Sequence, residues 1–332
     1  MSRLRYTIGR LLQAIPVLLG VVTITFLLTD AIPGDPVSIM LGPSPSAQQA
    51  DAIRAKFGLD QPLYVRYFNY LFDVIQLELG ESLYYGVPVT QKIMERLPVT
   101  MLLMVSSFTF ALVTAVPLGI ISAKRRNKPT DHISRIVALL GVSTPSFWIG
   151  LMLIIVFAYN VSWFPATGLV MPWAPPSAID GASNRIDVIV TTIRHLVLPT
   201  ITLGTLQMAA FTRIERSSML EVLGEEYVKL ARAYGVSEGK ILRKHAFRNA
   251  QLPLITIVGL QLTTALGGAV LTETVFSING MGRLVITAIQ NQDFLLVMGT
   301  TLMFGVVFVV GVIITDLSYA YVDPRVSFEG GD

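Results

Sequence analysis

The sequence predicts an all-α integral membrane protein with six transmembrane helices. Hydrophobic residues make up 52% of its 332 residues and charged residues only 14%, against about 25% charged residues in an average soluble domain. The apolar residues gather in long runs, each able to cross the roughly 30 Å hydrocarbon core of a bilayer as a helix. Lysine and arginine are clustered between these runs rather than spread, as the cytoplasmic preference of basic residues requires.

The composition also limits the chemistry that this chain can perform. There is no cysteine, which excludes disulfides, thiolate metal sites and a cysteine nucleophile, and leaves the redox compartment open. The net charge of +3 is small, and the clustered basic residues report membrane topology rather than a nucleic-acid partner.

The first membrane span follows a basic N-terminus. Arg3, Arg5 and Arg10 precede an uncharged run of 19 residues, Leu11 to Thr29. This run is too long for the apolar region of a signal peptide, and no A-x-A cleavage pattern follows it. We therefore expect residues 1–30 to be an N-terminal tail and a retained first helix that starts in the cytoplasm.

Residues 31–96 have an ordinary soluble composition, and turn sequences occupy residues 33–36 and 42–45. We expect a small extracytoplasmic subdomain here. Further along the segment, helical spacing gives an apolar, aromatic stripe, which we expect to pack on the membrane surface rather than bind a ligand. The stripe consists of Tyr64, Tyr67, Phe68, Leu71 and Ile75.

The second and third spans lie on either side of a basic cluster. Leu97 to Ala123 is uncharged for 27 residues, and residues 124–128 then supply four basic side chains for the cytoplasmic side. The third span, Ile136 to about Tyr159, is expected to break near Thr144-Pro145-Ser146. A proline-rich outer loop follows as far as Arg194.

The remaining spans are predicted at His195–Thr212, Asn249–Thr272 and Phe294–Thr315. Residues 97–322 would then form a core with five transmembrane helices and a cytoplasmic loop at 217–250, followed by a cytoplasmic tail at 323–332. Eight lysines or arginines lie between Arg213 and Arg248, against one between Glu273 and Asp293. This bias places both termini in the cytoplasm.

A polar island, residues 224–253, interrupts the apolar second half. Tyr227, Leu230, Ala231 and Tyr234 fall at i, i+3, i+4 and i+7, which predicts a short amphipathic helix. Gly235 then suits the left-handed position that ends a helix, and Ser237 can cap a second helix. The pattern predicts a helix-turn-helix between two spans. It is equally compatible with a solvated loop helix that has no partner.

The candidates for chemistry within the chain are weak. Residues 235–241 nearly match a phosphate-binding loop, but the glycine spacing is one residue short, no Ser or Thr follows Lys240 and no strand precedes it. The three histidines are scattered and form no metal motif. Charged residues stand only at span ends; of these, Glu273 follows a glycine-rich run and reads as an interfacial acid or, less well supported, as a contact on a substrate path.

The amino-acid sequence of the island resembles the EAA loop of binding-protein-dependent ABC importers, in the form found in dipeptide, oligopeptide and nickel permeases. The resemblance rests on Ala231-Arg232-Ala233, Gly235, His245, Asn249 and Pro253. Arg232 between the two alanines departs from the commoner motif, and the peptide-permease subgroup shares that departure. GLDQPLYVRYFNYL, LGES, TRIERSSMLEVL, LTETVFSINGMGRL and YVDPR extend the likeness over nearly the whole chain.

The resemblance implies the type I ABC importer fold and a permease subunit in the plasma (inner) membrane of a prokaryote, without enzymatic activity, metal or cofactor of its own. Its partners would be a second homologous permease, two cytoplasmic ATPase subunits that bind ATP and Mg, and an extracytoplasmic peptide-binding protein. The coupling helix and its loop would involve Glu225, Glu226, Tyr227, Ala231, Ala233, Gly235, His245, Asn249 and Pro253.

A short peptide is the substrate that the resemblance implies, with nickel or another small solute as the alternative within the family. An ATP-independent secondary transporter is the alternative from another class. Such a protein is expected to carry a mid-span carboxylate or broken helices in two related halves, and the sequence displays neither pattern.

Overall fold

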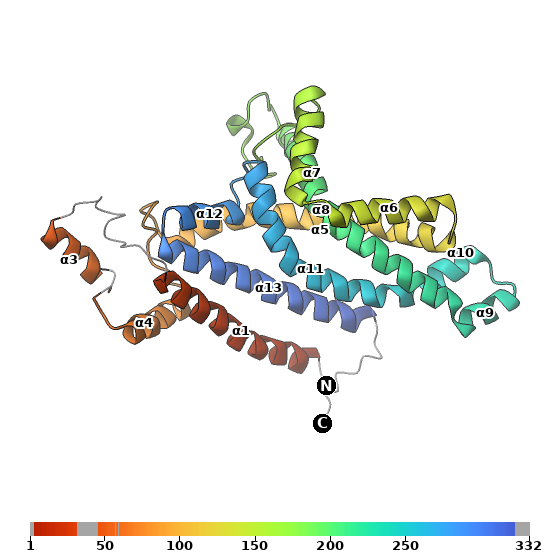
Figure 1. The fold of residues 1–332 in the computed structure, drawn as a ribbon, viewed down its shortest axis with the longest axis horizontal. Helices are drawn as coiled ribbons and strands as arrows, with labels where there is room; N and C mark the ends of the chain where they lie inside the picture. The colour runs from red at the N-terminus through yellow and green to blue at the C-terminus, as the bar shows by residue number, and fades with distance from the viewer. Residues whose placement is uncertain (1–2, 32–45, 57, 59, 323–332) are drawn as a thin grey trace. The chain divides into compact units, whose positions relative to one another are not determined.

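The computed structural model describes residues 3–31, 46–56, 58 and 60–322, and in this part of the chain the secondary structure is helical apart from one isolated bridge, Glu81 to Pro88. Figure 1 shows the order of the helices along the chain. The turns predicted at 33–36 and 42–45 and the tail predicted at 323–332 lie outside the described residues.

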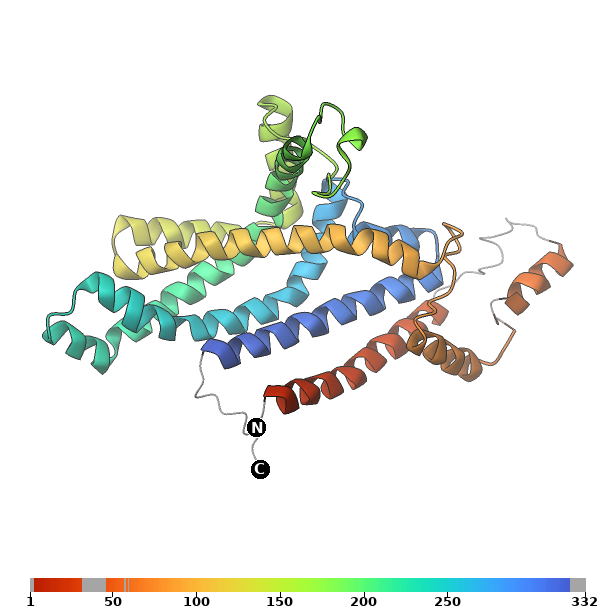
Figure 2. The same cartoon turned by 180° about the vertical axis from the view of Figure 1, so that it is seen from behind.

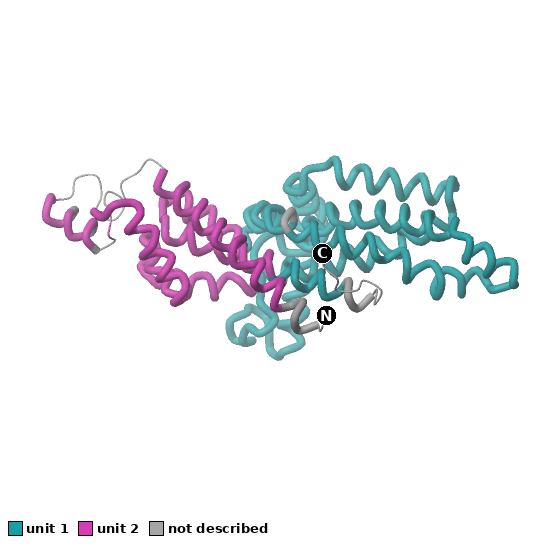
Figure 3. Tube along the Cα trace, turned by 90° about the horizontal axis from the view of Figure 1, so that it is seen from below, with its two compact units in different colours: residues 1, 101–278, 310–332 teal, residues 2–100, 279–309 magenta. Residues whose placement is uncertain are grey.

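The chain divides into two compact units (Figure 3). One unit joins residues 2–100 with 279–309, and the other joins 101–278 with 310–332. The division falls inside two long helices, α5 (Val89–Lys124) and α13 (Phe294–Val322). The extracytoplasmic position expected for residues 31–96 stays a prediction.

The unit built from residues 2–100 and 279–309 holds α1 (Arg3–Ala31), α3 (Ala47–Lys56), α4 (Leu63–Ile75), α12 (Met281–Gln290) and parts of α5 and α13. Its core contains Leu79, Val89, Ile93, Met281, Leu284, Ala288 and Leu296. Buried Asp293 accepts hydrogen bonds from the hydroxyl of Ser82 and, at 3.2 Å, from the amide of Leu296. It therefore caps α13 and fastens the Ser82 turn to this helix.

The other unit is organised around α8 (Arg185–Gly224) and α11 (Phe247–Val275), which pack against each other. Two shorter helices, α6 (Pro129–Ser143) and α7 (Ser146–Leu153), also pack on α8. The π-helical η1 (Ile154–Asn160) continues α7, and the 3₁₀ turn η2 (Pro176–Ala178) precedes α8. Figure 2 shows α8 and α11 from behind.

Among the described residues, four unbroken helices are long and apolar enough to cross a membrane: Ile8–Ala31, Val89–Lys124, Arg185–Gly224 and Phe294–Ser318. Two bent pairs also qualify, Pro129–Ser143 with Ser146–Asn160 at 104° and Glu238–Leu262 with Ala265–Val275 at 55°. Counting each bent pair as one span gives six, so the all-α, multi-span fold class is confirmed.

The break predicted near Thr144-Pro145-Ser146 is confirmed, and proline chemistry explains it. Thr144 leaves the helical region with ψ 128°, because the ring of the following Pro145 disfavours helical backbone at the residue before it. Pro145 then stands at the N-cap position of α7. The sharp bend separates α6 from α7.

The helix that contains the predicted span His195–Thr212 is longer than that span, because α8 begins at Arg185 and runs to Gly224. Asn184 starts the helix, since its side chain accepts hydrogen bonds from the amides of Ile186 and Asp187 at 2.8 and 3.1 Å. The Asp187 carboxylate accepts from the Asn184 amide at 3.1 Å, which completes a capping box. A hydropathy profile does not reveal the limits of α8, because polar residues extend the helix at both ends.

Candidate functional site

The polar island forms a loop between α8 and α11. After α8 come α9 (Glu226–Ala233), a turn at Gly235, α10 (Glu238–Lys240) and the π-helical η3 (Ile241–Ala246). The predicted helix-turn-helix is therefore present. Its second helix is not separate, however, because α10 and η3 continue directly into α11 (Figure 2).

The turn is set by the backbone at Gly235, which has φ +75° as the left-handed position predicts. The Gly235 amide donates to Arg232 O at 2.9 Å, and the Val236 amide donates to Ala231 O at 3.0 Å. These two bonds form a Schellman motif, which satisfies carbonyl groups at the end of α9. An ion pair of Arg232 with Glu238 (2.7 Å) spans the turn, but both side chains are partly exposed and such pairs add little stability.

Three residues of the predicted set meet where α9 touches the start of α11. Asn249 Nδ2 donates to Tyr227 Oη at 2.8 Å, and both Tyr227 Oη and Asn249 Nδ2 lie 3.4 Å from the carbonyl oxygen of His245. His245 thus contributes its backbone to these contacts. These bonds fasten α9 to the helix that continues as α11.

Val228 is the buried anchor of α9, with no exposed surface. Sequence periodicity missed it, because Val228 lies off the predicted stripe. The stripe itself divides: Ala231 is half-buried, Tyr227 makes the contacts described above, and Leu230 and Tyr234 are 57% and 80% exposed. Leu230 and Tyr234, one turn apart, leave an open apolar patch on α9.

The other predicted loop residues lie on α9, directly before it or on α11. Glu225 directly precedes α9, Glu226 in its first turn pairs with Lys229 at 2.7 Å, and Ala233 is its exposed last residue. Pro253 lies inside α11 and is exposed. The residues that resemble a phosphate-binding loop follow helix α9 and form the Gly235 turn and α10.

A buried carboxylate lies beneath the loop, on α8. Glu215 has no exposed surface, and both of its carboxylate oxygens accept from Nε2 of Gln251 on α11 at 2.9 Å. The backbones of α5 and α8 come close here: a Cβ atom at Gly119 would stand 2.6 Å from Cβ and Cγ of Glu215. Glu215 therefore ties α8 to the first turns of α11.

The next residue, Arg216, connects α8 to α6. Its Nε and terminal nitrogen donate to the buried Asp131 carboxylate at 2.6 and 2.9 Å. Ser122 Oγ of α5 and the amide of Asn127 donate to the same carboxylate at 2.6 and 2.9 Å. The sequence analysis missed the buried carboxylates of Glu215 and Asp131. The available signal was the adjacent charged pair Glu215-Arg216, which lies inside α8 because this helix continues past Thr212.

Glu273 lies near the C-terminal end of α11 and is fully buried. Its interpretation as an interfacial acid and its place on a substrate path both stay predictions.

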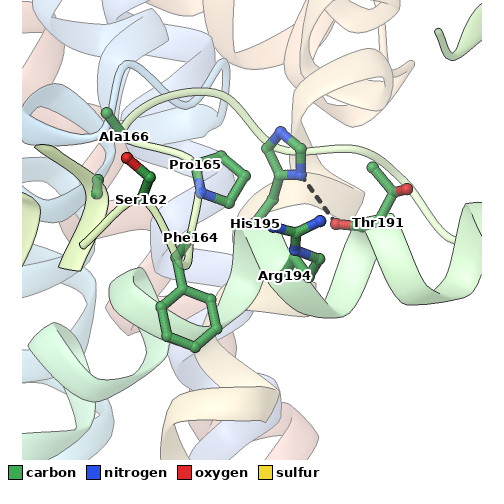
Figure 4. Close-up of a pocket in the computed structure, with 8 residues that line it drawn as sticks. Ser162, Phe164, Pro165, Ala166, Thr191, Arg194 and His195 are labelled. Atoms are coloured by element: carbon green, nitrogen blue, oxygen red, sulfur yellow. Dashed lines mark hydrogen bonds between the residues drawn. The ribbon is translucent and has the colours of Figure 1, made fainter. Parts of the chain in front are cut away.

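A pocket of about 360 Å³ lies elsewhere in the same unit, lined by Ala158, Ser162, Phe164, Pro165, Ala166, Thr191, Arg194 and His195. Figure 4 shows Ser162, Pro165 and Ala166 on one side and His195, Arg194 and Thr191 on the other. His195 Nδ1 lies 2.8 Å from the Thr191 carbonyl oxygen, and Arg194 donates to Trp163 O at 3.0 Å. The Arg194 bond holds the segment after η1 on α8, whereas the His195 contact lies within α8. In the described part of the chain, no three acidic, His or Cys side chains are placed to hold a metal ion.

Long apolar helices joined by a short loop helix define a multi-pass membrane protein. Comparison with known families agrees with this class. Residues 115–328 match the family of binding-protein-dependent transport system inner membrane components, and residues 3–104 match its N-terminal membrane component. The chain belongs to this family.

Individual relatives match over nearly their full length. The oligopeptide transport system permease protein AppB of Bacillus subtilis is 39% identical over 97% of this chain and 99% of its own. The dipeptide transport system permease protein DppB of Alkalihalophilus pseudofirmus is 39% identical over 98% and 100%. DppB of Escherichia coli K12 is 37% identical over 97% and 98%.

Proposed function

We propose that this chain is one permease subunit of an ATP-driven, binding-protein-dependent importer of dipeptides or oligopeptides. The family match and the peptide permeases named among its relatives support the substrate class. A second homologous permease completes the transmembrane path, two cytoplasmic subunits bind ATP and Mg, and an extracytoplasmic protein delivers the peptide.

The observation that carries this proposal is the state of α9. It is held by buried Val228 and by the Tyr227–Asn249 hydrogen bond of 2.8 Å, whereas Leu230 and Tyr234 remain exposed. A helix that is fixed to the permease and open to a partner suits the role of a coupling element, because movement of the partner then moves the helices to which α9 is fastened.

The contacts beneath α9 would carry this movement into the spans. η3 joins the loop to α11 without a break, and Gln251 on α11 bonds to Glu215 on α8. Arg216 then bonds to Asp131 on α6. Closure of the ATPase pair against α9 would thus move α11, α8 and α6 together.

The experiment that tests this role is co-purification of the ATPase with variants of the open patch. Leu230→Asp and Tyr234→Asp place a charge in the proposed interface, where central contacts are typically worth about 2 kcal/mol or more. We expect ATPase affinity to fall about thirty-fold or more for each, with membrane levels unchanged because both positions are exposed.

Lys229→Asp is the matched control, because it places the same side chain on α9 about 100° from Leu230. Its ATPase yield should stay near that of the unmodified chain. Equal ATPase recovery with Leu230→Asp, Tyr234→Asp and Lys229→Asp would contradict docking through this patch.

A further inference from the structure

Helix α4 presents three different faces around its axis. With about 100° of rotation per residue, Tyr67, Tyr70, Leu71 and Val74 share one face, and Arg66, Asn69 and Asp73 share another. A third face, within about 80° of arc, consists of Tyr64, Phe68, Phe72 and Ile75. The stripe predicted from the sequence mixed the first and third faces and omitted Phe72.

The first face packs on α1. Tyr67 and Tyr70 lie against Phe26, with ring centroids 5.4 and 6.0 Å apart, and Val22 belongs to the same cluster. Tyr67 Oη and Thr23 Oγ1 form a hydrogen bond of 2.6 Å. This face is therefore occupied by protein.

These contacts fix the level of α4 along α1. Thr23 lies eight residues before Ala31, the last residue of the candidate span Ile8–Ala31, which is roughly 12 Å at 1.5 Å per residue. Nearer the end of the span, Arg66 donates to Asp30 at 2.7 Å. The contacts of Tyr67 and Arg66 thus place α4 beside the last two turns of α1, at its C-terminal end (Figure 1).

The third face is open and strongly apolar. The exposed fractions are 67% for Tyr64, 64% for Phe68, 63% for Phe72 and 79% for Ile75. At the same level, α1 exposes Ile24, Leu27 and Leu28, as expected of a helix side that faces lipid in a multi-pass membrane protein. The lipid around these α1 side chains would also reach α4.

We propose that α4 is embedded in the bilayer leaflet that surrounds the C-terminal end of α1, with its Tyr64–Phe68–Phe72–Ile75 face among the glycerol groups and upper acyl chains. Aromatic side chains favour this depth, and amphipathic helices bury their apolar face in it. The polar face, with Asn69 bonded to Gln61 at 3.2 Å, points to the headgroups and water. Lipid, rather than another protein, is the occupant of the open face.

The test uses the natural lack of cysteine. Phe68→Cys, Phe72→Cys and, as the matched control on the polar face, Asn69→Cys are each labelled with a polarity-sensitive fluorophore in the full chain, reconstituted in phosphatidylcholine vesicles. Quenching by phosphatidylcholine with a nitroxide near the top of its acyl chain is compared with quenching by aqueous iodide.

We expect lipid quenching at positions 68 and 72 to exceed that at position 69 several-fold, and iodide quenching to show the reverse order. Tyr64→Cys supplies a second position on the same face if a Phe variant reaches the membrane poorly. Iodide quenching at position 68 equal to that at position 69 would overturn the proposal in favour of water. Protection of position 68 from both quenchers would overturn it in favour of a protein cover.

Discussion

At Gly235 a single backbone angle determines the direction that the chain takes between α9 and α10. The residue has φ +75°, and a Cβ atom placed there would meet no other atom within 4 Å. Space is therefore available for a side chain, and only the left-handed conformation requires glycine. A substitution at Gly235 therefore tests backbone strain alone, without the steric clash that usually accompanies it.

Gly235→Val should abolish transport without preventing membrane insertion. A β-branched residue in this conformation costs about 1 to 3 kcal/mol, which would shift the turn and misdirect Leu230 and Tyr234. We expect normal membrane levels, reduced ATPase recovery and loss of uptake, measured side by side in membranes.

Gly181→Val is the matched control, because Gly181 has φ +78° and equally open surroundings away from the loop. Gly239→Val adds a side chain within the loop, at α10, where the backbone is helical. Both controls should retain uptake. Uptake at the unmodified level by Gly235→Val would contradict the importance of this turn.

Residues of this kind differ in how well a sequence reveals them. Gly235 was predictable, since the end of a periodic segment followed by glycine defines a helix stop from local pattern alone. Val228, Glu215 and Asp131 were not, because their burial depends on partners such as Gln251 and Arg216 in other helices. Periodicity groups residues on a face, but it does not say whether protein, lipid or a partner covers that face.

Among the elements, α6 and α8 are held together by the Asp131–Arg216 pair. The Asp131 side chain is fully buried and Arg216 is 19% exposed. Asn127, between α5 and α6, has φ +61°, a conformation that Asn adopts more readily than most residues. The carboxylate thus satisfies the turn amide and the guanidinium together.

Asp131→Asn should destabilise this unit by about 3 to 5 kcal/mol, because removing one partner leaves a largely buried charge without compensation. The measurement is the midpoint of thermal unfolding of the purified complex. Replacing both partners, Asp131→Leu with Arg216→Met, should recover much of the loss.

Arg135→Met provides the comparison for an exposed pair, since Arg135 lies 3.7 Å from Asp131 and its side chain is 48% exposed. Its effect should stay within about 1 kcal/mol. Similar midpoints for Asp131→Asn and Arg135→Met would show that the pair between α6 and α8 does not stabilise the unit.

Sequence patterns predicted the existence of the helices better than their lengths. Apolar runs located the spans and Pro145 located the bend between α6 and α7. The runs underestimated α8, because its capping box at Asn184 and its polar end, including Arg216, lie outside the apolar window. The junction of η3 with α11 was also missed, since charged residues within a continuous helix resemble a loop in a hydropathy profile.

On the scale of the whole molecule, the charge distribution predicts the membrane orientation. Gln48→Cys, in the exposed part of α3, should react with a membrane-impermeant maleimide in spheroplasts, whose inner membrane is intact. Ser237→Cys in the loop should react only after permeabilisation. Ser82 would be a poor probe, because it is 1% exposed.

The natural chain contains no cysteine, so the unmodified protein is the blank for this labelling. The reverse pattern, with Ser237→Cys reacting in intact spheroplasts, would refute the cytoplasmic position of the loop and with it the access of an ATPase to α9.

The central claim, ATP-driven peptide import through this chain, is tested most directly by uptake into vesicles that contain the purified complex. We predict that a labelled dipeptide or oligopeptide accumulates only when the binding protein is supplied on the extracytoplasmic side and ATP on the cytoplasmic side. Leu230→Asp should abolish this accumulation. Peptide uptake that proceeds without ATP under an ion gradient, or ATP-dependent uptake of another solute but not of any peptide, would contradict it.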